Sequence, residues 1–173
     1  EGYAGAVVKD GRAILFHRVG DGDHGECVDA ATGRRVWLFK YQTEYRDDFG
    51  FDNGPRSVPT IADGRVYTFS ANGVLHCIDF KDGRKVWSLD VRRQYQCDKG
   101  FFGFAASPLV EGDHVILNVG GRDGHGIVAF DRKTGKLAWS ATDDEAGYAS
   151  PVAATIDGRR VALCFNRAGL TAL

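Results

Sequence analysis

An eleven-residue pattern that ends in tryptophan recurs three times, and it constrains the fold more than any other feature of the sequence. The copies run over residues 27–37, 77–87 and 129–139, so their tryptophans stand 50 and 52 residues apart. Each copy starts with a small residue, with aspartate two, glycine six, a basic residue seven and tryptophan ten positions later. Such self-similarity indicates a repeat architecture. The motif residues are Asp29, Gly33, Trp37, Asp79, Gly83, Trp87, Asp131, Thr134, Gly135 and Trp139.

Short β-rich runs surround each motif. Most of them follow an Asp-Gly or Gly-Asp pair, at 10–11, 63–64, 112–113 and 157–158. Asp-Gly between apolar runs is a strong signal for a two-residue hairpin, because a type I′ turn needs positive φ at both central residues. No segment has the sustained apolar spacing of a helix, so we expect essentially no helix. The second repeat predicts four strands, over about 57–62, 65–71, 74–80 and 85–91.

Four short strands every ~40–50 residues are typical of a β-propeller blade. The sequence therefore predicts an all-β fold of four-stranded antiparallel blades, in a single partial propeller over residues 1–173. The chain has no methionine and begins without a signal-peptide pattern, so we expect it to be part of a longer protein. It would hold about three and a half blades, the last one truncated. The expected blades span about 3–40, 57–91, 105–141 and 148–173.

The motif residues have a structural interpretation. The pairs at 32–33, 82–83 and 134–135 suit a turn between the third and fourth strands, with glycine at positive φ and the preceding aspartate capping backbone N–H groups. A tryptophan at a fixed blade position can wedge between neighbouring blades and donate its indole N–H to a backbone carbonyl. The alternative, a tryptophan that forms a stacking floor for a cofactor, needs a tryptophan out of register, and the sequence has none.

The third copy, AFDRKTGKLAW, resembles the tryptophan-docking motif of the pyrroloquinoline-quinone (PQQ) type repeat at every position. In the other two copies cysteine replaces the alanine and arginine replaces the lysine, and Asp82 replaces the threonine in the middle copy. The run from Ala106 to Trp139 is also similar to quinoprotein-like propellers of planctomycetes and related bacteria. The resemblance covers almost the whole chain.

This resemblance implies a propeller of eight blades and an exported, periplasmic location. Related proteins include quinoprotein alcohol dehydrogenases and a propeller lipoprotein of the outer-membrane β-barrel assembly machinery, so the fold does not fix the function. We weigh two hypotheses. The first is a non-catalytic scaffold that binds a protein, peptide or polymer at its channel mouth. The second is part of a PQQ- and calcium-dependent alcohol dehydrogenase, although no cofactor site is evident in this stretch: the vicinal cysteine pair typical of those dehydrogenases is missing.

Charge and hydropathy exclude other classes of partner. The formal net charge is −1, whereas a nucleic-acid-binding protein usually carries a basic excess. No apolar run approaches the ~18–20 residues that a membrane helix needs. We therefore expect neither nucleic-acid binding nor a transmembrane segment.

Long loops that cross from one blade to the next are the candidate binding site. In a compact repeat protein such loops usually carry function, and in a propeller they gather around the mouth of the central channel. The expected crossings run over about 41–56, 92–104 and 142–148. The alternative is ordinary solvated charge, with phenylalanines filling gaps between blades. The candidate channel-mouth residues are Asp47, Asp48, Asp52, Arg56, Lys99, Phe101, Phe102, Asp143, Asp144 and Glu145.

Other motifs point to structure rather than to chemistry. Residues 20–26 begin like a calcium loop but lack its later ligands, so we interpret them as a glycine-rich turn. The five histidines show no zinc spacing. Ser107 and Ser150 recur before inner strands and are predicted to be structural. Of the cysteines, only Cys97 lies alone in a predicted loop, as a candidate reactive or bridging thiol.

The predicted open array also has a physical consequence. Repeat arrays are stabilised by contacts between neighbouring units. A partial propeller has two blade faces without such a neighbour, and exposed apolar patches promote association. We therefore expect this chain, when isolated, to self-associate through its open blade faces.

Overall fold

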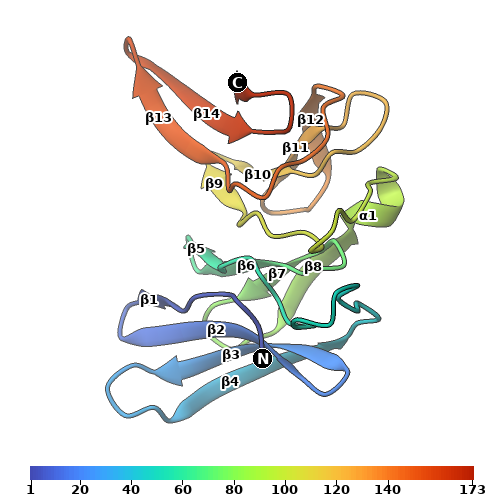
Figure 1. The fold of residues 1–173 in the computed structure, drawn as a ribbon. Coiled ribbons are helices and arrows are strands. Elements are labelled where there is room, and N and C mark those ends of the chain that lie inside the picture. The colour runs from blue at the N-terminus through green and yellow to red at the C-terminus, as the bar shows by residue number, and fades with distance from the viewer.

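The computed structural model describes all 173 residues, as fifteen strands and one short helix. The strands form four antiparallel sheets that follow one another in chain order, from the blue sheet to the red one in Figure 1. We name the sheets blades A to D. Blade A consists of β1 (Val7–Lys9), β2 (Arg12–Val19), β3 (Gly22–Asp29) and β4 (Arg35–Gln42). Blade B consists of β5 (Thr60–Ala62), β6 (Arg65–Phe69), β7 (Val74–Asp79) and β8 (Lys85–Asp90).

Blade C repeats this arrangement and blade D has three strands. Blade C consists of β9 (Leu109–Glu111), β10 (His114–Asn118), β11 (Ile127–Asp131) and β12 (Leu137–Ala141). Blade D consists of β13 (Val152–Ile156), β14 (Arg159–Phe165) and β15 (Leu170–Ala172). In every blade the strands pair in sequence order, and the first strands of consecutive blades contact each other. The first strands are therefore the inner strands, and the all-β prediction is confirmed.

The hairpins that join the first two strands of blades A, B and D have the predicted turn. Asp10 and Gly11 have φ of 49° and 71°, and Asp157 and Gly158 have φ of 48° and 76°. Positive φ at both central residues is the requirement of the type I′ turn. Aspartate tolerates this conformation better than most residues because its short side chain bonds the local backbone.

The repeated motif joins neighbouring blades. The indole N–H of Trp37 donates to the carbonyl oxygen of Phe80 at 2.9 Å, and that of Trp87 donates to the carbonyl oxygen of Arg132 at 3.1 Å. Each acceptor follows the motif aspartate of the next blade. Within its own blade, Trp37 pairs across the strands with Cys27, and a register shift follows that pair. The same shift follows the pairs of Trp87 and Trp139 with Cys77 and Ala129.

The hydrophobic core lies between the blades. The largest cluster has 13 buried residues and joins blades B and C, including Phe69, Leu75, Leu117 and Phe130. Two clusters of five buried residues each join blade A to blade B and blade C to blade D. Since each sheet buries its faces against the next sheet, the stability of the fold depends on neighbouring blades.

The expectation of essentially no helix is confirmed, since the only helix is α1, the four residues Val91–Gln94. Asp90 caps it by accepting a hydrogen bond from the Arg93 N–H, a usual role of aspartate at a helix start. In the 20–26 segment the turn is confined to residues 20–21, and β3 begins at Gly22. Extended pairing with β2 and β4 thus takes up residues that the glycine content had suggested were loop.

Candidate functional site

The segments that cross between blades form one face of the molecule. They run over 43–59, 91–108 and 142–151, each from the last strand of one blade to the first strand of the next. In antiparallel blades of this order, these segments and the turns between second and third strands lie at the same end. Contacts confirm the arrangement: the Lys99 ammonium bonds the Asp48 carboxylate at 2.7 Å, and the Tyr148 hydroxyl accepts from the Phe101 N–H at 3.0 Å. We call this end the loop face.

A buried ion pair organises the first crossing. The Arg56 guanidinium bonds the Asp47 carboxylate at 2.7 Å, and their side chains are 7% and 0% exposed. The other carboxylate oxygen of Asp47 accepts the N–H groups of Phe49 and Phe51. Although burial raises the pKa of Asp47, the Phe51 and Phe49 N–H groups and Arg56 bring it below its usual value. This pair therefore shapes the loop and leaves no free carboxylate oxygen at the surface.

Three more predicted acids hold neighbouring backbone or side chains. Asp52 accepts the N–H groups of Gly54 and Gly2. Asp143 accepts the Gly124 N–H, and Asp144 accepts the Asn166 side-chain amide at 3.0 Å. Of the predicted acids, Asp48, Asp143 and Glu145 are exposed, and Asp48 and Glu145 are each paired with one base. Most of the charged candidate residues thus form hydrogen bonds or ion pairs with other groups of the same face.

Exposed aromatic rings gather on the loop face. Phe49 lies 5.9 Å and 5.8 Å from Phe101 and Phe102, between ring centroids, and Phe102 lies 5.8 Å from Tyr148. Phe51 stacks beside Phe49 at 6.2 Å. Their exposures range from 40% to 69%, which is unusual for large aromatic side chains. With Tyr3, they form what we call the aromatic cluster: Tyr3, Phe49, Phe51, Phe101, Phe102 and Tyr148.

The aromatic cluster surrounds a hollow of about 350 Å³. Its walls are apolar apart from Arg56, whose guanidinium lies 5.6 Å from the Tyr3 ring centroid. That guanidinium also donates to the carbonyl oxygens of Gly54 and Asp52, so its charge is already compensated. The hollow therefore suits an apolar or aromatic side chain. It is lined by Tyr3, Phe51, Arg56, Phe102, Ala105 and Tyr148.

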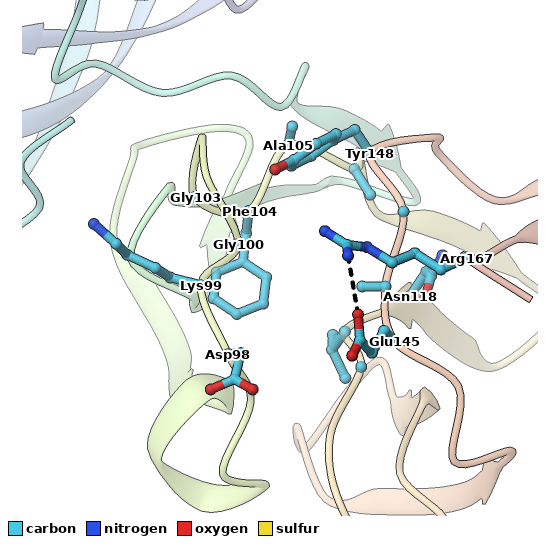
Figure 2. A pocket seen from close by; sticks show the side chains of 15 residues that line it. Asp98, Lys99, Gly100, Gly103, Phe104, Ala105, Asn118, Glu145, Tyr148 and Arg167 are labelled. Carbon is cyan, nitrogen blue, oxygen red and sulfur yellow. Dashed lines mark ion pairs between the residues drawn. The ribbon is translucent and has the colours of Figure 1, made fainter. Parts of the chain in front are cut away.

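A second, polar pocket of about 110 Å³ adjoins the hollow and shares Ala105 and Tyr148 with it. Figure 2 shows Asp98 and Lys99 on one side of this polar pocket and Asn118, Glu145 and Arg167 on the other. The Glu145 carboxylate pairs with the Arg167 guanidinium at 3.1 Å. One side of the pocket thus comes from the crossing of blade B to C, and the other comes from the crossing of blade C to D together with the end of β10 and a turn of blade D.

The recurrent serines are structural. The Ser107 hydroxyl accepts the Val58 N–H, and the Ser150 hydroxyl accepts the Ser107 N–H, both at 2.8 Å. Val58, Ser107 and Ser150 each stand directly before the proline that precedes or starts an inner strand. Each of these hydroxyls therefore bonds one blade to the next around the axis, which explains why the pattern recurs.

The cysteines lie inside the fold, and the histidines join no cluster of possible metal ligands. All four cysteines are free and buried. Cys97, the candidate reactive or bridging thiol, is buried like the others: burial and the neighbouring Asp98 raise its thiol pKa to about 11, and its Sγ contacts the Val91 carbonyl oxygen at 3.7 Å. No group of three or more His, Cys, Asp or Glu side chains is placed to hold a metal ion.

Comparison with known proteins decides the family. The model of a family described as outer membrane protein assembly factor BamB matches residues 24–173. The chain belongs to the PQQ-like repeat family. No curated protein sequence matches the chain significantly.

The one helix is far too short to cross a membrane.

Several solved structures share the fold. BamB from Moraxella catarrhalis superposes with a TM-score of 0.65 and 21% identity, over 99% of this chain and 46% of that one. Quinohemoprotein alcohol dehydrogenase ADHIIG from Pseudomonas putida HK5 has a TM-score of 0.57 and 25% identity, over 84% and 21%. The computationally designed Ika4 protein has a TM-score of 0.60 and 14% identity, over 97% and 88%. The chain thus spans less than half the length of these two natural relatives.

Sequence reasoning missed several residues of the site. The prediction of the first crossing named its acids and Arg56 but not Phe49 or Phe51, which lie between them. Tyr148 stands at the edge of the third crossing, where only the acids were named. An available signal was the aromatic residue in each crossing. Asn118 and Arg167 gave no such signal, because they belong to the second strand of blade C and to a hairpin turn.

Proposed function

We propose that this chain is the partner-binding part of a non-catalytic PQQ-like propeller, and that it binds a polypeptide with its loop face. The observation that carries the proposal is the aromatic cluster, which three crossings and the N-terminal segment build together. Aromatic side chains are enriched at protein interfaces and dominate their binding energy. Exposed apolar patches rimmed by charge are typical of interaction sites. The charged rim here includes Asp48, Lys99, Glu145 and Arg167.

The hollow within the aromatic cluster is the proposed site for an anchoring side chain of the partner. Binding energy concentrates where a side chain enters a pocket and loses its water. An apolar side chain of the partner fits this hollow, while the charged rim fixes the register of the partner. The family model also supports polypeptide binding, since its name describes an outer membrane protein assembly factor.

Site-specific photo-crosslinking tests the proposal. A photoreactive phenylalanine analogue replaces Phe102 on the loop face in one protein and Val86 on β8 in the control, where the side chain is 40% exposed. Both proteins are expressed as full-length protein in the native host. We expect a discrete polypeptide adduct from position 102 only. Equal labelling at both positions, or none, would contradict the proposal.

A second measurement ties the adduct to the aromatic cluster. The partner identified at position 102 is purified, and its affinity is measured for the protein with Phe51→Ser and Phe102→Ser. Loss of two central aromatic contacts should weaken binding by roughly 30-fold or more. Val86→Ser should leave the affinity unchanged. Unchanged affinity in the aromatic double variant would refute the role of the cluster.

The location of the protein is part of the same proposal. We propose export to the periplasm, as the PQQ-like resemblance implies. The complete reading frame tests this directly: an export or lipoprotein signal upstream supports it. A cytoplasmic fusion reporter that stays active in the native host would count against it.

The dehydrogenase alternative needs residues that are free to hold PQQ and calcium. Trp37 and Trp87 already pack on the next blade, and Trp139 stands in the same register beside His114. Asp47, Asp52, Asp143 and Asp144 already bind backbone or side-chain partners. The residues of this chain thus do not fit a PQQ and calcium site. Tight calcium-dependent binding of PQQ by the full-length protein would favour the dehydrogenase and overturn the scaffold proposal.

A further inference from the structure

Asn118 breaks the pattern of the second strands. In blades A to C the second strand pairs with the motif aspartate, at Arg12, Arg65 and His114. Four residues further along, blades A and B have Phe16 and Phe69, whereas blade C has Asn118. The two phenylalanines are fully buried, and Asn118 is 1% exposed. A small polar side chain therefore stands where a large ring fills the other blades, and it lines the polar pocket.

The orientation of the Asn118 amide is fixed by its neighbour in blade D. Its Nδ2 donates to the carbonyl oxygen of Phe165 at 3.1 Å. A carbonyl oxygen only accepts, so the nitrogen must face Phe165 and Oδ1 must face the other way. Oδ1 is buried and has no hydrogen-bond partner. Since an unpaired buried carbonyl is costly, Asn118, a residue of the polar pocket's lining, carries a buried acceptor that lacks a donor.

The walls of the polar pocket combine balanced charge with aromatic surface. Its charged side chains are two acids and two bases: Asp98, Glu145, Lys99 and Arg167. The bases are already paired, Lys99 with Asp48 and Arg167 with Glu145. A charged ligand would have to break one of these pairs. A neutral ligand could donate to Glu145 and accept from Arg167 without separating them.

Aromatic rings and glycines complete the walls. Phe104 and Tyr148 supply apolar surface, and Gly100, Gly103 and Gly147 also line the pocket. The Tyr148 hydroxyl already accepts the Phe101 and Phe102 N–H groups, so its ring is held in place. A water occupies about 30 Å³ in the liquid, so a pocket of about 110 Å³ takes roughly four water-sized groups, and a sugar ring would enter it with one edge.

We propose that the polar pocket binds a neutral polyhydroxylated ligand of the sugar class. One hydroxyl donates to Asn118 Oδ1, and others bond the Glu145–Arg167 pair at the rim. The C–H faces of the ring pack against Phe104 or Tyr148, since aromatic side chains pair an apolar surface with polar surroundings. This inference rests on the pocket and holds whether or not the aromatic cluster binds a polypeptide.

Ligand-observed NMR on the chain tests the class of ligand. The neutral probes are D-glucose, D-galactose and N-acetyl-D-glucosamine, and the charged probes are L-serine and L-glutamate. We expect saturation transfer to at least one neutral sugar and to none of the charged probes. No transfer to any sugar, or transfer to a charged probe only, overturns the proposal. Stronger binding of a β-linked oligosaccharide than of its monosaccharide identifies a glycan chain as the source, and the reverse identifies a free sugar.

Three variants place the binding in the polar pocket. Asn118→Phe fills the pocket with the ring that blades A and B carry, so it should fold and abolish binding. Glu145→Ala removes an exposed rim carboxylate and should weaken binding severalfold without affecting folding. Arg122→Ala, on the same blade outside the pocket, should bind as the unmodified chain does. Retained binding in Asn118→Phe, or equal loss in all three, would show that the pocket is not the site.

Discussion

At the scale of single residues, two glycines have a double role in joining the blades. Gly83 and Gly135 have φ of 75° and 72°, and a Cβ on them would come within 2.7 Å of the Trp37 ring and 2.9 Å of the Trp87 ring. Gly33 has the same motif position and a φ of 70°, with nothing within 4 Å. An added side chain at Gly33 therefore meets only the backbone cost of the turn, whereas one at Gly83 or Gly135 also meets a tryptophan ring.

We predict that Gly135→Ala is more destabilising than Gly33→Ala. Both changes carry the backbone cost of alanine at positive φ, about 1–2 kcal/mol. Gly135→Ala also pushes a methyl group into the Trp87 ring, which should add about 1–3 kcal/mol. Chemical denaturation of the two variants measures the difference. Equal losses would mean that the tryptophan contact contributes little to stability.

His76 makes the interface between blades A and B sensitive to acid. Its ring is 4% exposed, lies 4.4 Å from the Tyr41 ring centroid, and has no hydrogen-bond partner on either nitrogen. Burial lowers its pKa to about 3. The unfolded chain protonates this histidine below pH ~6.5, but the folded chain keeps it neutral. The neutral His76 ring therefore makes its full contribution to the free energy of unfolding above pH ~6.5, and this contribution decreases as the pH falls towards 3.

We predict that His76→Leu reduces the loss of stability in acid. The contribution of His76 has a maximum slope of about 1.4 kcal/mol per pH unit. The free energy of unfolding, measured from pH 7 to pH 4, should fall less steeply in the variant. Removal of an unpaired buried imidazole should also stabilise the variant at pH 7. Parallel pH profiles for the two proteins would contradict this account.

At the scale of elements, the crossing segments are ordered by side chains rather than by strand pairing. Asp47 holds two backbone N–H groups and Arg56 in the first crossing, and Tyr148 holds two N–H groups of the second. Such side-chain bonds replace the backbone partners that a loop lacks. They also place the aromatic rings, since Phe49 and Phe51 are the residues that Asp47 holds.

We predict that Asp47→Ala loosens the first crossing while the blades stay folded. The change leaves the buried Arg56 guanidinium without its carboxylate and frees the Phe49 and Phe51 amides. Hydrogen exchange at these two amides should become faster, with little change in β2 and β6. Asp48→Ala removes only an exposed partner of Lys99 and should leave the exchange unchanged. Unaltered protection in Asp47→Ala would show that the loop is held by other contacts.

At the scale of the whole molecule, the two end blades expose apolar side chains. In blade D, Val152, Phe165 and Leu170 are 55%, 58% and 66% exposed, and in blade A Val8 is 64% exposed. The equivalent faces between inner blades are buried in the three core clusters. The isolated chain therefore presents the kind of surface that the fold otherwise covers with another blade.

We predict that the isolated 173-residue chain self-associates through these faces. Burial of exposed apolar surface favours association by roughly 25 cal/mol per Å². Light scattering should give a mass that rises with concentration, and Val152→Lys with Leu170→Lys should lower it. Val86→Lys, on the outer strand of blade B, should not. A monomer at high concentration would refute the prediction.

The sequence by itself determined the hairpins, the repeat and the family, because each turn and motif depends on residues within about ten positions of one another and the motif then recurs along the chain. Aspartate and glycine define the turns, alternating apolar residues define the strands, and the spacing of Trp37, Trp87 and Trp139 defines the blade. Only the tertiary structure decided what the loop face offers. Phe49 and Phe101 meet across more than 50 residues, and the free oxygen of Asn118 depends on a carbonyl in the next blade. Whether an acid such as Asp47 is exposed or buried likewise depends on Arg56 and on the path of the loop, and local sequence does not encode that path.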